Sequence, residues 1–345
     1  MPADLKSLFP EEIEEMILPL GLEKYRAKQI FEWMTRGVSS FDEMTNISKK
    51  QREILSGSFV ISHAEPVNVL RSKTDGTLKI LCAFPDGAYA ECVALPYEHG
   101  ISACISTQSG CRMGCSFCAS TKAGFTRNLL PGEMISQIQL LNSEKQKEDP
   151  GFFINHVVMM GIGEPLDNYE NSVRFLRLVN HPSGLGIGMR NISLSTCGLV
   201  DKINRLAKED LQITLSVSLH APDNEIRSKL MPVNNKYCVE ELIEACRGYI
   251  ASTGRRISFE YSMISGVNDS PYCAQKLSDL LSGMLCHVNL IPVNSIKERD
   301  FRASDKKALR IFRDILTKNH INSTVRRTMG ADISAACGQL RAKNL

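Results

Sequence analysis

Segments that resemble β-strands and α-helices alternate along the chain from about residue 97 to residue 333. Such alternation is typical of parallel strands joined by crossover helices. Six or seven units fall short of a closed eightfold barrel, so we predict an α/β fold built as a partial (β/α)6-type barrel. The expected strands are Ala103–Ser106, His156–Met160, Ile192–Thr196, Ile213–Ser218, Ile257–Tyr261, Val288–Ile291 and Thr324–Arg326. The expected helices are Glu133–Glu144, Tyr169–Val179, Val200–Lys208, Val239–Ser252 and Lys306–His320.

The residues before the barrel are expected to form a small accessory domain, helical up to about residue 60 and then β-hairpin in character. Apolar residues at helical spacing indicate helices over Glu11–Leu18 and Glu23–Arg36. Two Asp-Gly turn dipeptides then bound strand-like runs at Leu78–Ala83 and Tyr89–Ala94. We therefore expect an accessory domain over residues 1–96, a barrel over residues 97–333 and a tail over residues 334–345.

Composition limits where the protein works. No stretch of about 18 apolar residues is present and the start lacks a signal-peptide layout, so we expect a cytoplasmic protein without a membrane span. In that reducing compartment, structural disulfides are not expected among the twelve cysteines. The net charge of +3 neither predicts nor excludes a nucleic-acid partner. Core packing is expected for Cys82, Cys92, Cys197, Cys238, Cys246, Cys273 and Cys286.

Cys111, Cys115 and Cys118 form a C-x3-C-x2-C run on a loop that follows the first barrel strand. Three thiolates can hold three corners of a four-iron cluster, whereas such clusters usually have four cysteine ligands. The missing ligand leaves one iron open to a substrate or cosubstrate. Gly110 and Gly114 suit a loop that wraps closely around a cofactor. Zinc is the alternative, but no second cysteine pair follows at the spacing that zinc sites use.

Polar and small residues recur where successive barrel strands end, which is where such folds bind ligands. Each one alone would be an ordinary turn or strand-end residue. Their recurrence beside the cysteine loop favours a binding site. The residues are Gly163 and Glu164 after the second strand, Ser195 in the third, Ser218, Leu219 and His220 after the fourth, and Asn294 after the strand that holds Val288.

Cys337 lies near the end of the chain among small residues, on a tail that could reach the barrel mouth. A thiolate is a good nucleophile, and the oxidation state of a thiol changes easily. Cys104 precedes the cysteine run by seven residues and could be the partner of Cys337. Spacing alone does not establish that pairing.

Together these motifs resemble two nested families. The cysteine run resembles that of the radical S-adenosylmethionine (SAM) enzymes, where the methionine part of SAM chelates the open iron. The whole set resembles the RlmN family of dual-specificity RNA adenosine carbon-2 methyltransferases, from the helical N-terminus to the last residues. The set consists of Cys104-x6-Cys111-x3-Cys115-x2-Cys118, Gly161-x-Gly163-Glu164-Pro165-Leu166, Ser218-Leu219-His220-Ala221-Pro222 and Asp332-x4-Cys337-Gly338-Gln339-Leu340.

This resemblance implies a radical methylation that uses a 4Fe-4S cluster, held by the three loop cysteines, and two SAM molecules. Cys337 takes a methyl group from one SAM, and a radical made from the second activates that methyl group for addition to carbon-2 of adenine. Glu91 accepts the adenine proton, and Cys104 then releases the product by forming a transient disulfide with Cys337. The implied SAM contacts are Gly163, Glu164, Ser195, Ser218, Leu219, His220 and Asn294.

The implied substrates are an adenosine in the peptidyl-transferase region of 23S rRNA and the adenosine directly 3′ of the tRNA anticodon. An electron donor such as flavodoxin or ferredoxin is also implied, and we expect a monomer that does not act on DNA. The accessory domain could grip folded RNA by its shape and backbone. The basic run Arg302, Lys306, Lys307, Arg310 and Arg313, with Arg326-Arg327 after it, is interpreted mainly as a solvated helix face.

Three other functions remain open at this point. The nearest is a carbon-8 adenosine methyltransferase of the antibiotic-resistance type, which uses the same paired cysteines. Gly163-Glu164-Pro165-Leu166 and Ser195-Thr196-Cys197-Gly198 favour carbon-2 over it. A non-catalytic Fe–S or zinc RNA-binding protein would have no use for Cys337. A radical SAM enzyme that acts on a small molecule or peptide would leave the accessory domain unexplained.

Overall fold

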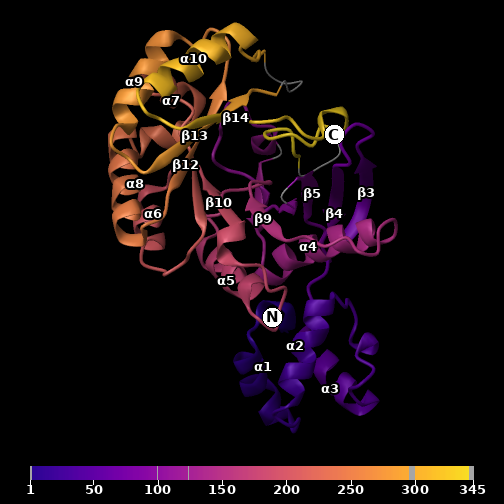
Figure 1. Cartoon of the computed structure of the whole chain (residues 1–345). Coiled ribbons are helices and arrows are strands. Elements are labelled where there is room, and N and C mark those ends of the chain that lie inside the picture. The colour runs from indigo at the N-terminus through magenta and orange to yellow at the C-terminus, as the bar shows by residue number, and fades with distance from the viewer. Residues whose placement is uncertain (1, 99, 123, 295–299, 342–345) are drawn as a thin grey trace.

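The centre of the molecule is one ten-stranded sheet, in the order β14-β13-β12-β11-β10-β9-β6-β5-β4-β3. The computed structural model describes residues 2–98, 100–122, 124–294 and 300–341. Seven strands of the sheet run parallel and curve into a partial barrel (Figure 1). They are β6 (Gly100–Cys104), β9 (His156–Met159), β10 (Ile192–Thr196), β11 (Thr214–Ser218), β12 (Ile257–Met263), β13 (Cys286–Pro292) and β14 (Ser323–Val325).

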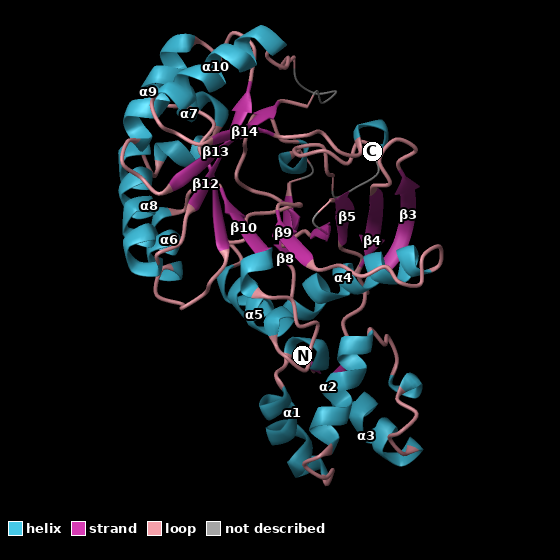
Figure 2. Cartoon of the chain, in the orientation of Figure 1, coloured by secondary structure: helices cyan, strands magenta, loops and turns pink. Residues whose placement is uncertain are grey.

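Helices cover the convex face of these strands, as Figure 2 shows. They are α4 (Pro131–Gln146), α5 (Tyr169–Asn180), α6 (Val200–Leu206), α7 (Asn224–Leu230), α8 (Val239–Thr253), α9 (Pro271–Leu281) and α10 (Lys306–Lys318). The predicted alternation is confirmed, with shifted ends at several elements. Two helices were missed: α7 is only two turns long, and α9 begins at a Ser270-Pro271 start signal that the sequence analysis did not use.

Three antiparallel strands extend the same sheet beyond the barrel: β3 (Glu65–Arg71), β4 (Leu78–Ala83) and β5 (Tyr89–Tyr97). β5 pairs with β6, so the predicted boundary near residue 97 falls between two neighbouring strands of one sheet. A separate small hairpin joins β7 (Gln108–Gly110) to β8 (Phe125–Asn128) and brackets the cysteine loop. Residues 342–345 of the predicted tail lie outside the described residues.

The N-terminal helices form a lobe beneath the barrel, seen at the bottom of Figure 1. They are α1 (Pro10–Ile17), α2 (Arg26–Arg36) and α3 (Lys49–Ser58), with a short parallel pair of β1 (Ala3–Asp4) and β2 (Phe59–Val60). The lobe is joined to the barrel by polar contacts, because Lys6 donates to Ser136 and Gln139 of α4, and Arg174 of α5 bonds Ser7 and Glu12.

The core beneath the sheet confirms most of the expected packing. Cys82, Cys92, Cys246, Cys273 and Cys286 are buried. Cys238 is the correction: it is half-buried, because it occupies the N-cap position of α8 at the protein surface. All twelve cysteines are free thiols. None of the helices in the described parts of the chain is both long and apolar enough to cross a membrane.

Candidate active site

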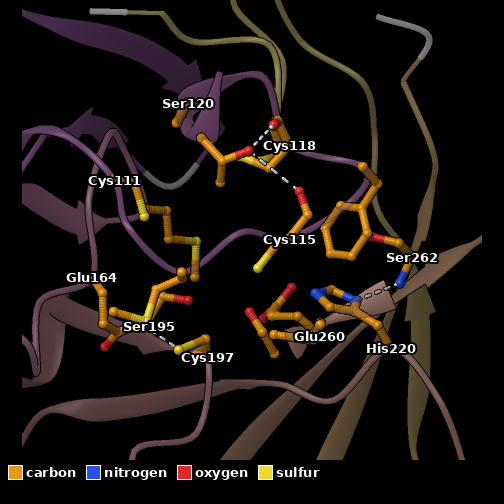
Figure 3. Close-up of a pocket in the computed structure, with 18 of the residues that line it drawn as sticks. Cys111, Cys115, Cys118, Ser120, Glu164, Ser195, Cys197, His220, Glu260 and Ser262 are labelled. Atoms are coloured by element: carbon orange, nitrogen blue, oxygen red, sulfur yellow. Dashed lines mark hydrogen bonds between the residues drawn. The ribbon is translucent and has the colours of Figure 1, made fainter. Parts of the chain in front are cut away.

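A cavity opens at the carboxyl ends of strands β9 to β14, under the loop between β7 and β8 (Figure 3). Its volume is about 160 Å³, roughly ten times what one water needs. A space of this size at the end of a barrel is a ligand site rather than a packing defect. It brings together ten of the residues selected from the sequence: Cys111, Cys115, Cys118, Gly163, Glu164, Ser195, Ser218, His220, Asn294 and Cys337.

Backbone geometry holds the cysteine loop in a tight turn that only glycine permits. Gly110 has φ +77°, and a Cβ on it would lie 1.8 Å from the carbonyl oxygen of Gly124. The loop is also tied to α7, since the Ser116 N–H donates to the Leu230 carbonyl at 2.8 Å. Any larger residue at position 110 would push the two sides of the loop apart.

The three loop thiols fit a four-iron cluster better than a single metal ion. Burial raises the pKa of Cys111 to about 12, and burial with the nearby Cys118 and Cys111 thiols raises that of Cys115 well above its usual value. A metal centre would therefore have to displace their protons. Among the described residues, no three His, Cys, Asp or Glu side chains surround one point as a zinc ion requires. Thiolates on separate irons of a cluster need not converge in this way.

Glu164 is a buried carboxylate at the floor of the cavity. Its Oε2 accepts from the Cys197 N–H at 2.7 Å and its Oε1 from the Leu166 N–H at 3.0 Å. Burial raises its pKa, although these hydrogen bonds oppose the change. Gly163 before it has φ +106°, and a Cβ there would lie 2.6 Å from the Gln108 side chain. The Gly-Glu pair therefore places a fixed acidic acceptor where a bound cation, such as an amino group, would meet it.

His220 presents a neutral imidazole to the cavity. Burial, with help from the Arg227 charge, lowers its pKa to about 3. Its Nδ1 accepts from the Ser262 N–H at 2.9 Å, so the ring proton sits on Nε2, which Figure 3 shows turned toward the cavity. The ring stacks edge-on against Phe117 of the cysteine loop at 4.7 Å between centroids. His220 can thus donate one hydrogen bond to a ligand.

Glu260 and Arg326 also line the cavity, and neither was selected from the sequence. Glu260 accepts from Ser258 at 3.1 Å and from Asn289 at 2.7 Å, and the Arg326 Nη1 lies 3.9 Å from its Oε2. The alternation of polar residues along β12 was the available signal, because one face of a barrel strand points inward. Arg326 had been grouped with the basic surface run. The interpretation as a solvated face covered most of that run, and the five residues on or just before α10 are exposed as expected, whereas Arg326 is half-buried.

The C-terminal tail places Cys337 at the rim of this cavity. The Asn294 Nδ2 donates to the Cys337 carbonyl at 3.1 Å, and the Ala119 N–H beside Cys118 donates to the Gly338 carbonyl at 2.8 Å. Ser120 adds a bond to the Leu340 carbonyl at 2.9 Å. The tail is therefore tied to the cysteine loop on one side and to the strand ends on the other.

Cys104 lies behind the tail in an apolar cluster with Val93, Leu95, Ile162 and Met329. Burial raises its pKa to about 12, with a smaller contribution from the nearby Cys337 thiol and an opposing one from Arg326. Cys104 is therefore a protonated thiol at neutral pH. The contribution of the Cys337 thiol to the raised pKa of Cys104 indicates that the fold brings residues 104 and 337 close together.

Besides Cys104, two of the residues selected from the sequence, Leu219 and Glu91, lie outside the cavity lining. The Leu219 side chain is fully buried in the core, and its carbonyl accepts from the Arg227 Nε at 3.2 Å. Glu91 is buried on β5, 3.1 Å from the Lys79 Nζ, and its Oε2 accepts from the Arg341 N–H at 2.6 Å. Cys197 is buried as expected, and it also lines the cavity.

Comparison with known proteins finds similarity over the whole chain. The radical SAM superfamily model matches residues 105–273, and the model of the ribosomal RNA large subunit methyltransferase N-terminal domain matches residues 3–61. The probable dual-specificity RNA methyltransferase RlmN of Alkaliphilus oremlandii is 51% identical over 342 residues, which cover 99% of this chain and 98% of that protein. The protein with the same description from Lachnospira eligens is 50% identical, over 99% of this chain and 96% of that one. The crystal structure of a radical SAM methyltransferase from Sphaerobacter thermophilus superimposes with a TM-score of 0.95 at 42% identity, covering 99% of this chain and 100% of that chain.

Proposed function

Because the chain belongs to the RlmN family of dual-specificity RNA methyltransferases, we propose that it methylates carbon-2 of adenosine in both 23S rRNA and tRNA. The targets would be an adenosine of the peptidyl-transferase region and the adenosine directly 3′ of the anticodon. Membership makes the chain a radical SAM enzyme that acts on RNA, so the non-catalytic alternative does not hold. The observation that carries the finer proposal is the position of Cys337, at the rim of the cavity and close to both Cys118 and Cys104.

The family implies a 4Fe-4S cluster and SAM, and three thiols in one cavity are a suitable donor set for the cluster. Cys111, Cys115 and Cys118 would hold it, and when bound it supplies the electron that cleaves SAM. Gly163, Glu164, Ser195, Ser218, His220 and Asn294 line the space where SAM would bind. A contact from Leu219 could come only from its backbone, because its side chain faces the core.

Cys337 would act as the methyl carrier. Its sulfur bonds to the methyl carbon of one SAM, the bond from that carbon to the SAM sulfonium sulfur breaks, and S-adenosylhomocysteine leaves. A hydrogen atom would then pass from this methyl group to the radical made from the second SAM, and the methylene radical left on Cys337 would bond to carbon-2 of adenine. A cysteine carrier is needed because carbon-2 of adenine is electrophilic and cannot attack SAM itself. Covalent catalysis thus replaces one inaccessible step with several easier ones.

Release of the product would use Glu91 and Cys104. Glu91 would take the proton from carbon-2 while the radical adduct gives back the electron spent on SAM cleavage. The Cys104 sulfur would then bond to the Cys337 sulfur as the bond from that sulfur to the transferred carbon breaks, and the freed carbon would take up a proton to become the methyl group. The resulting disulfide must be reopened by an external reductant. The Cys104 thiol has a pKa of about 12 and must lose its proton during this attack. Glu91 is bonded to Lys79 and to the Arg341 N–H, so the end of the tail must shift before this carboxylate meets the adenine.

The remaining parts of the proposal concern partners. The target adenine must leave its stack to reach the cavity. The exposed cations on and just before α10 provide a surface for RNA phosphates. An electron donor such as flavodoxin or ferredoxin would serve the cluster, and we expect a monomer that works in the cytoplasm.

The test is mass spectrometry of the C-terminal peptide after anaerobic purification with the cluster intact, together with analysis of the methylated RNA. We expect a SAM-derived methyl group on Cys337, absent from Cys337→Ala, and 2-methyladenosine in both RNAs. An unmodified Cys337 after incubation with SAM would overturn the carrier mechanism. If 8-methyladenosine were the product instead, the carbon-8 alternative would replace the carbon-2 assignment.

A further inference from the structure

Arg227 is a fully buried arginine on α7, directly below the cavity, with 0% of its surface exposed. Among the described residues, its guanidinium donates only to uncharged acceptors. These are the carbonyls of Cys197 (2.7 Å), Leu219 (3.2 Å), Ser218 (3.3 Å) and Tyr237 (3.5 Å), and the Asn234 Oδ1 (3.0 Å).

Within the described parts of the chain, no carboxylate forms an ion pair with this guanidinium. Arg127, which is only half-buried, bonds both Asp86 and Glu133. Burying an unpaired charge is costly, and buried charges are normally paired or hold a metal. Among the residues that the structure describes, Arg227 is therefore a buried cation that is hydrogen-bonded but has no counter-charge.

The cysteine loop lies next to this charge. Arg227 and Leu230 sit on the same short helix, and the Leu230 carbonyl accepts from the Ser116 N–H between two of the loop cysteines. The guanidinium also donates to the carbonyls of Cys197 at 2.7 Å and Ser218 at 3.3 Å, and both residues line the cavity together with Cys115. The guanidinium is therefore held against the wall of the cavity that contains the predicted cluster ligands.

We propose that Arg227 is the internal counter-cation of the iron–sulfur cluster, which holds the reduction potential of the cluster higher than the thiolates alone would allow. This inference rests on the proposed cluster at Cys111, Cys115 and Cys118. Three thiolates make the cluster site anionic, and reduction adds one further negative charge. A fixed cation in a buried, low-dielectric site stabilises the reduced form more than the oxidised form.

A purely structural role is the alternative, because Arg227 also ties together the ends of β10 and β11. Two kinds of variant separate charge from scaffolding. Arg227→Gln removes the charge and part of the hydrogen bonding, whereas Asn234→Asp keeps the guanidinium and places a carboxylate 3.0 Å from its Nη1. Arg227→Lys keeps the positive charge but loses the planar guanidinium group and its fixed set of N–H donors.

The measurement is a redox titration of the purified holoprotein without RNA. The electron paramagnetic resonance signal of the reduced cluster reports its extent at each applied potential. We expect Arg227→Gln and Asn234→Asp to lower the midpoint potential, so that the ratio of reduced to oxidised cluster at a fixed applied potential falls at least tenfold, a shift of about 59 mV. Arg227→Lys should stay near the wild-type value.

The matched control is Arg112→Gln, which removes an arginine beside Cys111 that is half-exposed and paired with Asp167 at 2.9 Å. That exposed charge is screened by water, so its loss should shift the potential less.

The proposal is overturned if Asn234→Asp keeps the wild-type potential, even if Arg227→Gln changes it, because the effect would then come from scaffolding. It is also overturned if Arg227→Lys behaves like Arg227→Gln in potential or in iron content. If Arg227→Gln and Asn234→Asp both fail to load iron while Arg227→Lys loads it, the result supports the proposal, because the cluster then requires the positive charge itself. A wild-type protein without a reducible cluster would instead reject the proposed function, which keeps the two failures distinct.

Discussion

The two walls of the cavity are built in different ways. The cluster wall, which comprises residues 108–118, 161–166, 197 and 220, is held by buried hydrogen bonds among strand ends and the loops that follow them. The tail wall, which is formed by Cys337 and Gly338 and backed by Cys104 and the rest of residues 329–341, is held by bonds that span about 250 residues. Asp75 accepts from the Gly330 N–H at 2.8 Å, Lys79 donates to the Ser334 carbonyl at 3.1 Å, and Glu91 accepts from Arg341.

This difference separates two tasks. The buried polar groups of the cluster wall are hydrogen-bonded to one another, which suits a cofactor that must not move. The tail wall is fixed by a few part-buried hydrogen bonds from side chains distant in sequence, and segments with few such contacts open at low free-energy cost. A methyl carrier has to visit both a methyl donor and an RNA base, and it needs such a support. Changes in one wall should therefore leave the task of the other intact.

The largest expected effect comes from removing one cysteine from each wall. Cys115→Ala and Cys337→Ala should each reduce RNA methylation by on the order of 10⁴-fold or more, as loss of a nucleophile or an essential ligand does. Only Cys115→Ala should lose the iron, which absorbance and iron analysis would measure. Loss of iron from both variants would show that the two walls are not independent.

Removing the second tail-wall cysteine should stop the reaction at a later stage. We expect Cys104→Ala to complete one half-turnover and accumulate RNA covalently attached to Cys337, which denaturing electrophoresis and mass spectrometry would detect. Cys92→Ala is the matched control, because Cys92 lies on β5 next to the partner of Cys104 but faces the apolar core. That variant should still turn over. The absence of an adduct in Cys104→Ala would remove the assigned role of Cys104.

A smaller effect should follow from loosening the tail. Burial would raise the pKa of Asp75, but hydrogen bonds from Thr77, Gly330 and Ser72 outweigh it and lower that pKa to about 2, so Asp75 is charged at neutral pH. Asp75→Ala removes this charged acceptor, and we expect about a tenfold slower methylation with normal iron content. Faster hydrogen exchange over residues 330–341 would show the cause.

Asp86→Ala is the control for that experiment. Asp86 occupies the equivalent position in the other Asp-Gly turn and bonds Ala88 in the same way, but its side chain pairs with Arg127 instead of the tail. Hydrogen exchange of the tail should therefore not change in Asp86→Ala. Equal exchange in both variants would mean that Asp75 stabilises the hairpin and not the tail.

The smallest effect concerns stability on the cluster wall. The pKa of His220 falls from 6.5 to about 3 on folding, so the unfolded chain binds a proton more readily than the folded chain. The contribution of His220 to the free energy of unfolding is therefore fully present above pH 6.5 and is lost as the pH falls toward 3. The expected loss is about 2 kcal/mol between pH 7 and pH 5. His220→Asn should lose this decrease in denaturant titrations of the cluster-free protein. Asparagine tolerates the positive φ of this site, and His320→Asn controls for the left-handed backbone.

Local sequence patterns were sufficient for the barrel and for most of the cavity. The strand at Ile192–Thr196 was predicted with its observed bounds, because alternating apolar residues report burial on one face of a strand. The cysteine loop and the Gly163-Glu164 pair were found because their residue types and spacing are local. The edge strand β3 received no bounds, since it is mostly exposed and carries no alternation of apolar residues.

What the sequence determined by itself is therefore the order of strands and helices and the chemistry that local spacing carries. Only the tertiary structure decided which distant residues complete the site. Glu260 and Arg227 look like ordinary charged residues until the barrel curves and buries them, and Arg326 looks like one until it lines the cavity. Glu91 meets the tail only after about 250 residues of chain have folded. Periodicity reports the environment of each face of an element, whereas the identity of the neighbour across the cavity depends on long-range packing that no short window contains.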